Sequence, residues 1–180
     1  MECLKNVGKI FEEDFKKSIP SYCMVYRLKD TAQSYNSNAN TRFTWNNPCD
    51  FFIFSSQSHN LYAIECKSTK YKSMAFQTEK DDTEKMIKYH QIQSLSDLSK
   101  YDGIVAGFLF NFRDEKNDSQ RTYFQNINDF NRMCDEIQKK SFNEMDLILN
   151  GVVKVNGNKK RTHYMWDIDG LFKKIGGVNL

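Results

Sequence analysis

The sequence predicts an α/β fold in which helices flank a central β-sheet, and three observations lead to this prediction. Two apolar runs, residues 48–54 and 61–67, flank a segment rich in turn-forming residues, which is the pattern of a β-hairpin with a longer loop. A third run, Ile104–Phe112, is almost continuously apolar, as expected of a buried central strand. Apolar residues recur at helical spacing in three further segments, 5–18, 83–98 and 128–140.

The composition is that of a globular domain. The chain has 180 residues, of which 39% are hydrophobic and 14% aromatic, and this is enough to bury one core. No repeat or linker divides it, so we expect a single domain over residues 1–180, with a core of about 5–140 and a helix-and-hairpin extension of about 141–180. No apolar run of about 18 residues is present, and no apolar segment follows the first residues. We therefore expect neither a membrane span nor a signal peptide, and a cytoplasmic location.

The net charge and the cysteines limit the possible partners. The formal net charge of +3 permits binding to nucleic acid but does not demonstrate it. The five cysteines are scattered without a C-x-x-C motif, which indicates reduced thiols and argues against a zinc site. Cys49 and Cys66 lie next to acidic residues, so a catalytic thiol is an alternative to consider.

The first predicted helix, residues 5–18, has an acidic edge. Its apolar stripe includes Phe11 and Phe15, and Glu12 lies at the edge of that stripe. An acidic edge of this kind is either part of a site or simply solvated. A strand over 22–28 follows, and then a long polar loop, 30–47, which contains Arg42, Phe43 and Trp45. A loop of this length in a compact domain is often functional.

The predicted hairpin brings charged side chains together. A pairing centred between Gln57 and Ser58 places Asp50 directly across from Glu65, and cross-strand partners have Cβ atoms about 4.5–5.5 Å apart. Lys67 is two residues beyond Glu65 and therefore points to the same face. The hairpin should thus hold two carboxylates and one ammonium group on otherwise apolar strands.

Charged groups on apolar strands cost free energy unless they are paired or bind a metal. Two adjacent carboxylates repel each other, and a divalent cation relieves the repulsion; an all-oxygen site suits Mg²⁺ or Mn²⁺. Lys67 would then stabilise negative charge on a phosphate in a transition state. The alternative is a half-exposed strand with a Glu–Lys pair that has no catalytic role.

The predicted helix over 83–98, opened by Thr83 as N-cap, contributes one more candidate. Gln91 lies four residues from both Ile87 and Leu95, so it should point inward with them. There it would contact a metal or its water, or else be a core amide bonded to backbone. His90 has no partner at ligand spacing and is not a predicted metal ligand.

The rest of the chain should add a strand at 121–127, a helix at 128–140 and a short helix at 144–149. Residues 152–155 are then predicted to pair with 162–166 across Asn156-Gly157, a strong hairpin signal. This hairpin carries a basic cluster at its tip or edge, and a last helical turn is expected at 167–172.

The order of these motifs resembles the PD-(D/E)xK nuclease core. The acidic segment that contains Glu12, then Asp50, then Glu65-Cys66-Lys67 and then His90-Gln91 follow one another as in RecU-type Holliday junction resolvases, over roughly residues 5–132. The resemblance implies a restriction-endonuclease-like core, with a mixed central sheet flanked by helices. It also implies a homodimer that nicks two strands of a four-way DNA junction symmetrically.

The resemblance further implies a role for each motif residue. Asp50 and Glu65 would bind Mg²⁺, for which Mn²⁺ can substitute, and Gln91 would complete the metal site. Lys67 would stabilise the transition state, and Glu12 would support the site. Apart from the resemblance, we expect basic side chains to bind the branched DNA: Arg42, Lys70, Lys72, Lys159, Lys160 and Arg161.

Three departures from the family pattern are visible. Val7 stands where an arginine is common, Pro48 stands where a threonine is usual, and the short loop 30–47 replaces a long stalk. A compact member encoded by a phage, acting in a bacterial cell, would fit these differences. Two other functions stay open: a nuclease that acts on flap, duplex or single-stranded DNA, and a DNA-binding module without catalysis.

Overall fold

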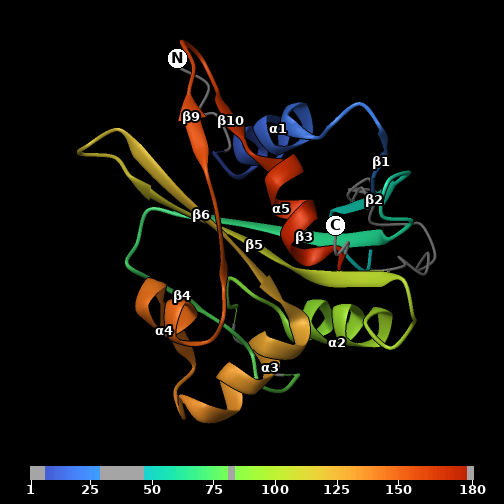
Figure 1. Ribbon diagram of the computed structural model, residues 1–180. Helices are drawn as coiled ribbons and strands as arrows, with labels where there is room; N and C mark the ends of the chain where they lie inside the picture. Colours follow the sequence, from blue (N-terminus) through green and yellow to red (C-terminus); the bar gives the residue numbers. More distant parts are fainter. Residues whose placement is uncertain (1–6, 29–46, 81–83, 178–180) are drawn as a thin grey trace, which may run out of the picture.

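The computed structural model describes residues 7–28, 47–80 and 84–177, and a six-stranded sheet lies at its centre (Figure 1). The strand order is β1-β2-β3-β5-β6-β8. β3 and β5 are parallel and every other neighbouring pair is antiparallel, so the sheet is mixed. The strands are β1 (Cys23–Arg27), β2 (Phe51–Ser55), β3 (Leu61–Thr69), β5 (Ile104–Asp114), β6 (Ser119–Asn126) and β8 (Val153–Val155).

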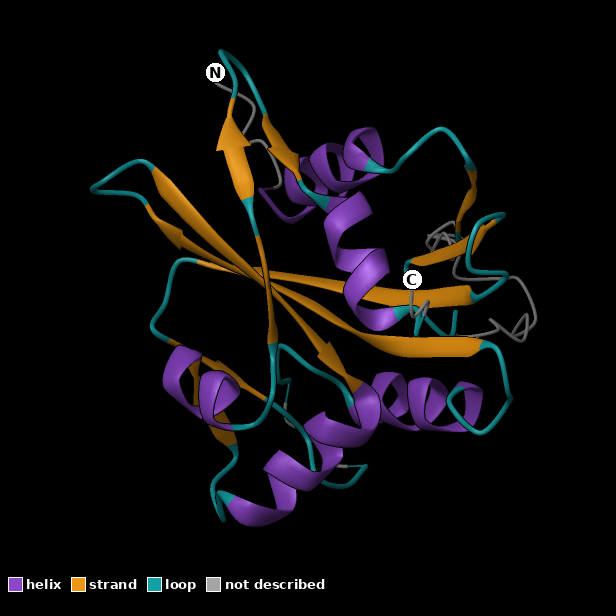
Figure 2. Ribbon diagram, in the orientation of Figure 1, coloured by secondary structure: helices purple, strands orange, loops and turns teal. Residues whose placement is uncertain are grey.

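Helices cover both faces of this sheet, as Figure 2 shows. One face carries α1 (Val7–Ser18) and α5 (Ile168–Ile175). The other carries α2 (Tyr89–Leu98), α3 (Ile127–Glu136) and α4 (Glu144–Leu149). Two small ribbons complete the fold: β4 (Ser73–Ala75) pairs with β7 (Ser141–Asn143), and β9 (Gly157–Lys159) pairs with β10 (Tyr164–Trp166). The predicted α/β fold with a mixed central sheet flanked by helices is confirmed.

A separate apolar core lies on each face of the sheet. On the α2 and α3 side, the rings of Phe108 and Phe130 lie 4.8 Å apart between centroids. On the α1 and α5 side, Tyr62 stacks on Phe172 at 4.0 Å. Full burial of each such ring contributes about 1.5–3 kcal/mol. Because both faces are covered, a charged side chain in the middle of the sheet has little access to water.

The register of the β2–β3 hairpin agrees with the predicted one. Phe51 pairs with Ile64 and Ile53 pairs with Tyr62. Extended by one residue, this register places Asp50 opposite Glu65. Alternation along β3 sends Tyr62 and Ile64 into the α1-side core, while Ala63 enters the α2-side core. The hydrophobic pattern sets this register, since a slip by one residue would exchange the two faces.

The predicted start of the 83–98 helix is wrong. Helix α2 begins at Tyr89, and Thr83 lies outside the described residues. Ile87 is fully buried but not helical: its N–H donates to the carbonyl of Ala75 and its carbonyl accepts from Gln77, which forms a bridge beside Phe76. The N–H and carbonyl groups of Ile87, which a longer helix would have paired within itself, are therefore hydrogen-bonded to the segment 75–77.

The predicted pairing of 152–155 with 162–166 is also wrong. β8 pairs with β6 at the edge of the central sheet, and β10 pairs with β9 instead. The turn of the last hairpin therefore lies at 160–163 rather than at Asn156-Gly157. Gly157 is opposite Trp166, and a Cβ at Gly157 would overlap the indole ring. The glycine thus permits a close approach and does not form the turn.

The residues after 140 are part of the sheet and of both layers. β8 extends the central sheet, and Val155 is buried with Trp166 in the α1-side core. Asp167 is the N-cap of α5, and its carboxylate accepts the N–H of Gly170 at 2.9 Å. Phe142 of β7 and Leu147 of α4 are buried in the core on the α2 and α3 side of the sheet.

The Gly157–Trp166 contact can be tested by substitution. Gly157→Ala should lower the free energy of unfolding by about 1–3 kcal/mol, because the added methyl group overlaps the indole. Chemical denaturation measures the change. Asn158→Ala, at an exposed position of the same strand, is the matched control and should change stability by less than about 0.5 kcal/mol. Equal midpoints for Gly157→Ala and wild type would contradict the close approach.

Candidate active site

Asp50 directly precedes β2 and is hydrogen-bonded on one side to the residue after β1 and on the other side to β3. Its N–H donates to the carbonyl of Ile64 at 3.1 Å, and its own carbonyl accepts the N–H of Leu28 at 2.9 Å. Its side-chain Oδ2 accepts the N–H of Cys66 at 2.8 Å. Backbone pairing on both sides therefore fixes the carboxylate beside the segment that carries Glu65.

Glu65 is buried in the middle of β3, with only 4% of its surface exposed. Its Oε1 lies 2.9 Å from Nζ of Lys67, two residues further along the strand. The same oxygen accepts a hydrogen bond from the side-chain amide of Gln91, at the start of α2. The structure thus brings Gln91 of α2 to the Glu65–Lys67 pair of β3.

Gln91 also closes the first turn of α2. Its Oε1 accepts the backbone N–H of Lys88, the N-cap residue, at 3.0 Å. Since the carbonyl oxygen is used in this cap, the amide nitrogen is the group directed at Glu65. In this arrangement Gln91 orients the carboxylate, and it would have to rotate about its terminal bond to offer an oxygen to a cation.

The site carries more negative charge than its burial favours. Burial and the nearby Glu65 carboxylate raise the pKa of Asp50 to about 7, although the Cys66 N–H and Lys67 oppose the shift. Burial also raises the pKa of Glu65, against the effect of Lys67. The charge of Glu12 raises both pKa values. Burial and mutual repulsion therefore both act against full ionisation.

Glu12 reaches the site from α1 and is paired with Arg27. The Nε and Nη2 atoms of Arg27, on β1, donate to the same Glu12 oxygen at 2.9 and 2.5 Å. Arg27 was not among the residues predicted from the sequence. The one sequence signal for it is a lone guanidinium in an otherwise largely apolar strand. Glu12 and Arg27 also line a small cavity of about 290 Å³ at the surface of α1.

The donor set suits a hard divalent cation. Among the described residues there is no group of three or more His, Cys, Asp and Glu side chains arranged to hold a metal. Two carboxylates are nevertheless sufficient for Mg²⁺, which usually keeps several waters and is bound through one or two carboxylates. Asp50 and Glu65 are the residues that would hold it, and a bound cation would relieve the repulsion that raises their pKa values.

The cysteines do not fit a nucleophilic role. Cys66 is buried, and its burial together with the carboxylates raises its pKa well above the usual range. The pKa of Cys49 is raised for the same reasons. A reactive cysteine needs a lowered pKa and an electropositive environment. Both thiols therefore stay protonated at neutral pH, which argues against a catalytic thiol.

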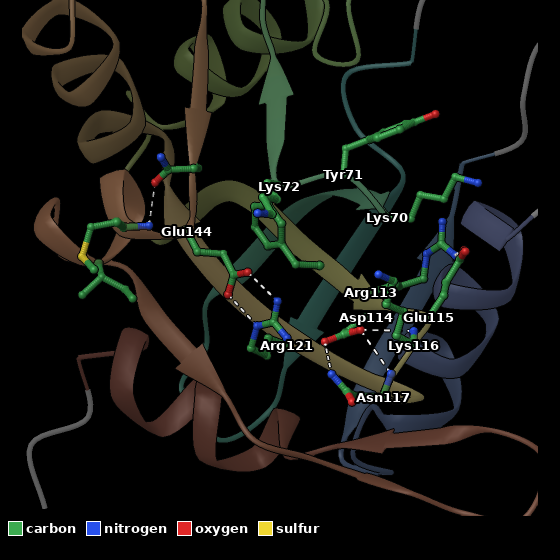
Figure 3. A pocket seen from close by; sticks show the side chains of 14 residues that line it. Lys70, Tyr71, Lys72, Arg113, Asp114, Glu115, Lys116, Asn117, Arg121 and Glu144 are labelled. Carbon is green, nitrogen blue, oxygen red and sulfur yellow. Dashed lines mark hydrogen bonds and ion pairs between the residues drawn. The ribbon is translucent and has the colours of Figure 1, made fainter.

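The predicted DNA-binding residues fall on two separate elements. Lys70 and Lys72 follow β3 directly and line a groove (Figure 3). Lys160 and Arg161 are exposed in the β9–β10 turn, and Lys159 forms an ion pair with Asp118. In the view of Figure 1, β4 lies below the tip of the β5–β6 hairpin and the β9–β10 turn lies above it.

Arg42, Phe43 and Trp45 lie outside the described residues.

The chain is similar to known proteins in sequence and in structure. The chain is 36% identical over 126 residues to the SPbeta prophage-derived uncharacterized protein YotM of Bacillus subtilis strain 168; the match covers 69% of this chain and 58% of that protein. The chain therefore spans less than two thirds of the length of this relative. The solved structure of Hjc, a Holliday junction resolvase of Archaeoglobus fulgidus, is 15% identical with a TM-score of 0.43, and the match covers 78% of this chain and 88% of that chain.

No family model matches the chain, so membership of the RecU-type family stays a prediction. At a TM-score of 0.43, the similarity to Hjc does not by itself assign a fold or a function. In residues 7–28, 47–80 and 84–177, no helix is both long enough and apolar enough to cross a bilayer.

Asp50→Asn should stabilise the metal-free protein at alkaline pH. With its pKa raised to about 7, folded Asp50 keeps a proton between about pH 4 and 7 that the unfolded chain has released. The contribution of Asp50 to the free energy of unfolding therefore falls as pH rises through this window and is constant above it. Asparagine cannot ionise but can still accept the Cys66 N–H. The variant should gain on the order of 1–3 kcal/mol at about pH 8 and much less at about pH 4.

Denaturation in EDTA at the two pH values measures this difference. Asp97→Asn is the matched control, since Asp97 is an exposed carboxylate paired with Lys100 on the far part of α2. Asp97→Asn removes only a solvent-exposed ion pair, so it should change stability by less than about 1 kcal/mol at either pH. A gain for Asp50→Asn that is equal at both pH values would contradict the raised pKa.

Proposed function

We propose that this protein is a divalent-metal-dependent endodeoxyribonuclease that resolves four-way DNA junctions by paired nicks. One observation carries the proposal: Asp50 faces Glu65 across the hairpin, and Lys67 lies beside Glu65 at 2.9 Å. Two carboxylates able to hold Mg²⁺, next to an ammonium group, are the components that phosphodiester hydrolysis requires.

Each residue has a distinct task in this proposal. Asp50 and Glu65 would hold Mg²⁺, for which Mn²⁺ can substitute, and the cation would polarise a phosphate oxygen of the DNA and activate a water. Asp50 and Glu65 fix its position, and Gln91 holds Glu65 in orientation through the amide hydrogen bond. Lys67 supplies positive charge where negative charge develops on the phosphate. Glu12, held in place by its ion pair with Arg27, lies close enough to raise the pKa values of Asp50 and Glu65.

The junction as substrate and the homodimer rest on the RecU-type order of motifs. A four-way junction has two equivalent strands to cut, and a symmetric dimer presents two equivalent sites to them. Basic residues on the β3–β4 turn and on the β9–β10 turn would contact phosphates, so that binding should weaken steeply with salt. The prophage-derived relative supports a phage-type member acting in a bacterial cytoplasm.

A second candidate keeps the same chemistry but acts on a flap or another DNA with an unpaired strand. The observation that favours it is the groove next to Lys70 and Lys72, which exposes the aromatic ring of Tyr71. A ring of this kind offers a surface for unpaired bases, whereas a four-way junction can be fully paired.

Loss of either carboxylate should abolish nicking but preserve DNA binding. Asp50→Asn and Glu65→Gln remove the charges that hold the cation, so we expect nicking of a labelled junction in Mg²⁺ to fall by several orders of magnitude. Affinity for the same junction, measured in EDTA, should stay within about threefold because phosphate contacts dominate it. Asp97→Asn is the control and should nick like wild type.

A panel of junction, flap, duplex and single-stranded DNA separates the rival substrates. Preferential nicking of the junction supports the leading proposal, and preference for a linear duplex rejects it. Binding without any cleavage in Mg²⁺ or Mn²⁺ would show a DNA-binding module instead of a nuclease.

Lys67→Met should slow nicking on the order of 100-fold at saturating Mg²⁺. The substitution removes the ammonium group that would stabilise negative charge on the phosphate, but it keeps most of the aliphatic side chain. Single-turnover kinetics on a labelled junction measures the loss. Lys100→Met, at an exposed lysine of the α2–β5 connection, should have no effect. A normal single-turnover rate for Lys67→Met would exclude this lysine from transition-state stabilisation.

A further inference from the structure

A groove of about 850 Å³ opens beyond the carboxyl ends of the parallel strands β3 and β5 (Figure 3). The β3–β4 turn, the β5–β6 hairpin and α4 form its walls. Lys70 enters this groove three residues after Lys67 of the candidate active site. The groove and the proposed catalytic residues are therefore connected along one strand.

Positive charge predominates in the groove. Five cationic side chains line it, of which two are neutralised: Arg113 pairs with Glu115 at 2.9 Å, and Arg121 pairs with Glu144 at 2.7 Å. The carboxylate of Asp114 accepts backbone N–H groups within its own turn. The described residues show no carboxylate paired with the remaining three cations, which are Lys70, Lys72 and Lys116.

The groove also offers aromatic and apolar surface. Tyr71 is 67% exposed, with Nζ of Lys70 at 6.0 Å from its ring centroid. Phe112 is at the base of the groove, and Met145 and Ile148 of α4 are exposed along its side. A water-exposed ring beside lysines without carboxylate partners suits a ligand that has both a flat apolar face and negative charge.

The walls of the groove are held in place before any ligand binds. Both guanidinium nitrogens Nε and Nη2 of Arg121 donate to the Glu144 carboxylate at 2.7 Å, and the Tyr123 hydroxyl donates to it at 3.0 Å. These bonds tie α4 to β6. The N–H of Tyr71 donates to Oγ1 of Thr69 at 3.1 Å, which orders the turn that carries the aromatic ring.

We propose that this groove binds an unpaired segment of a DNA strand, with a base stacked on Tyr71 and phosphates on Lys70, Lys72 and Lys116. Single-stranded nucleic acid is the ligand class that combines exposed base faces with a charged backbone. A duplex offers only the backbone, because its bases are stacked on each other. The inference rests on the proposed function for its DNA substrate, and it favours the second candidate, a DNA that carries an unpaired strand.

The groove is tested by binding, without any need for cleavage. The full-length protein in EDTA is titrated with a fluorescent single strand of about 10 nucleotides and with a duplex of the same sequence. Tyr71→Ala should weaken single-strand binding about 5- to 100-fold and duplex binding less than about twofold. Tyr101→Ala is the matched control: Tyr101 is 66% exposed, but it lies before the opposite end of β5, and its loss should change neither affinity.

The lysines give an independent measurement. Lys70→Ala with Lys72→Ala should weaken binding of both DNAs and lower the salt dependence of single-strand affinity, by about 0.7 in the log–log slope for each phosphate that is no longer neutralised. Lys100→Ala, at an exposed lysine paired with Asp97, is the control and should leave the slope unchanged. Thermal melting of every variant checks that its fold is intact.

The outcomes separate this inference from the nuclease proposal. Wild-type single-strand affinity for Tyr71→Ala, or an equal loss for single strand and duplex, would overturn the groove as a site for unpaired DNA. Such a result leaves nicking and its dependence on Asp50 untouched. Selective loss of single-strand binding, in a protein that never nicks DNA, would support the groove while the nuclease proposal fails.

Discussion

A carboxylate buried in the middle of the central sheet is the constraint on which this structure depends. Glu65 is 4% exposed, and an unpaired charge at such a depth costs several kcal/mol. The ammonium group of Lys67 and the amide of Gln91 compensate for that cost by meeting the same oxygen. β3 must therefore keep its register, and α2 must begin where its first turn reaches the strand. An apolar side chain in place of Glu65 would need no such compensating contacts, so stability alone does not account for the carboxylate.

The second carboxylate makes the arrangement chemically specific. Asp50 lies opposite Glu65 because β2 and β3 pair in that register, and the N–H of Cys66 holds its oxygen. Glu12 adds a third carboxylate, which is paired with Arg27. Such a concentration of charge in a desolvated place is typical of a functional site, because it is unfavourable until a cation is present. The parallel pairing of β3 and β5 then opens the groove at the ends of both strands, close to these groups.

Much of this site could be predicted from the order of residues, because its main pair is local. The hairpin has a period of two, so counting from its centre was enough to oppose Asp50 and Glu65 and to place Lys67. Gln91 was placed correctly by its spacing to Leu95, although its other predicted neighbour, Ile87, is not helical. Arg27 and Tyr71 were not identified, since their significance depends on contacts between distant segments. The prediction of a turn at Asn156-Gly157 was wrong because Gly157 packs against the ring of Trp166.

The apolar periodicities alone were sufficient for the α/β class, the β2–β3 register and the identity of the acidic pair, since these depend on neighbours within one or two elements. Packing across the molecule decided where α2 begins, which strands β8 and β10 join, and which atom of Gln91 faces Glu65. It also decided that the β3–β4 turn, the β5–β6 hairpin and α4 enclose a groove. Such features result from competition among distant groups for the same backbone partners and the same apolar surface, and no local pattern records that competition.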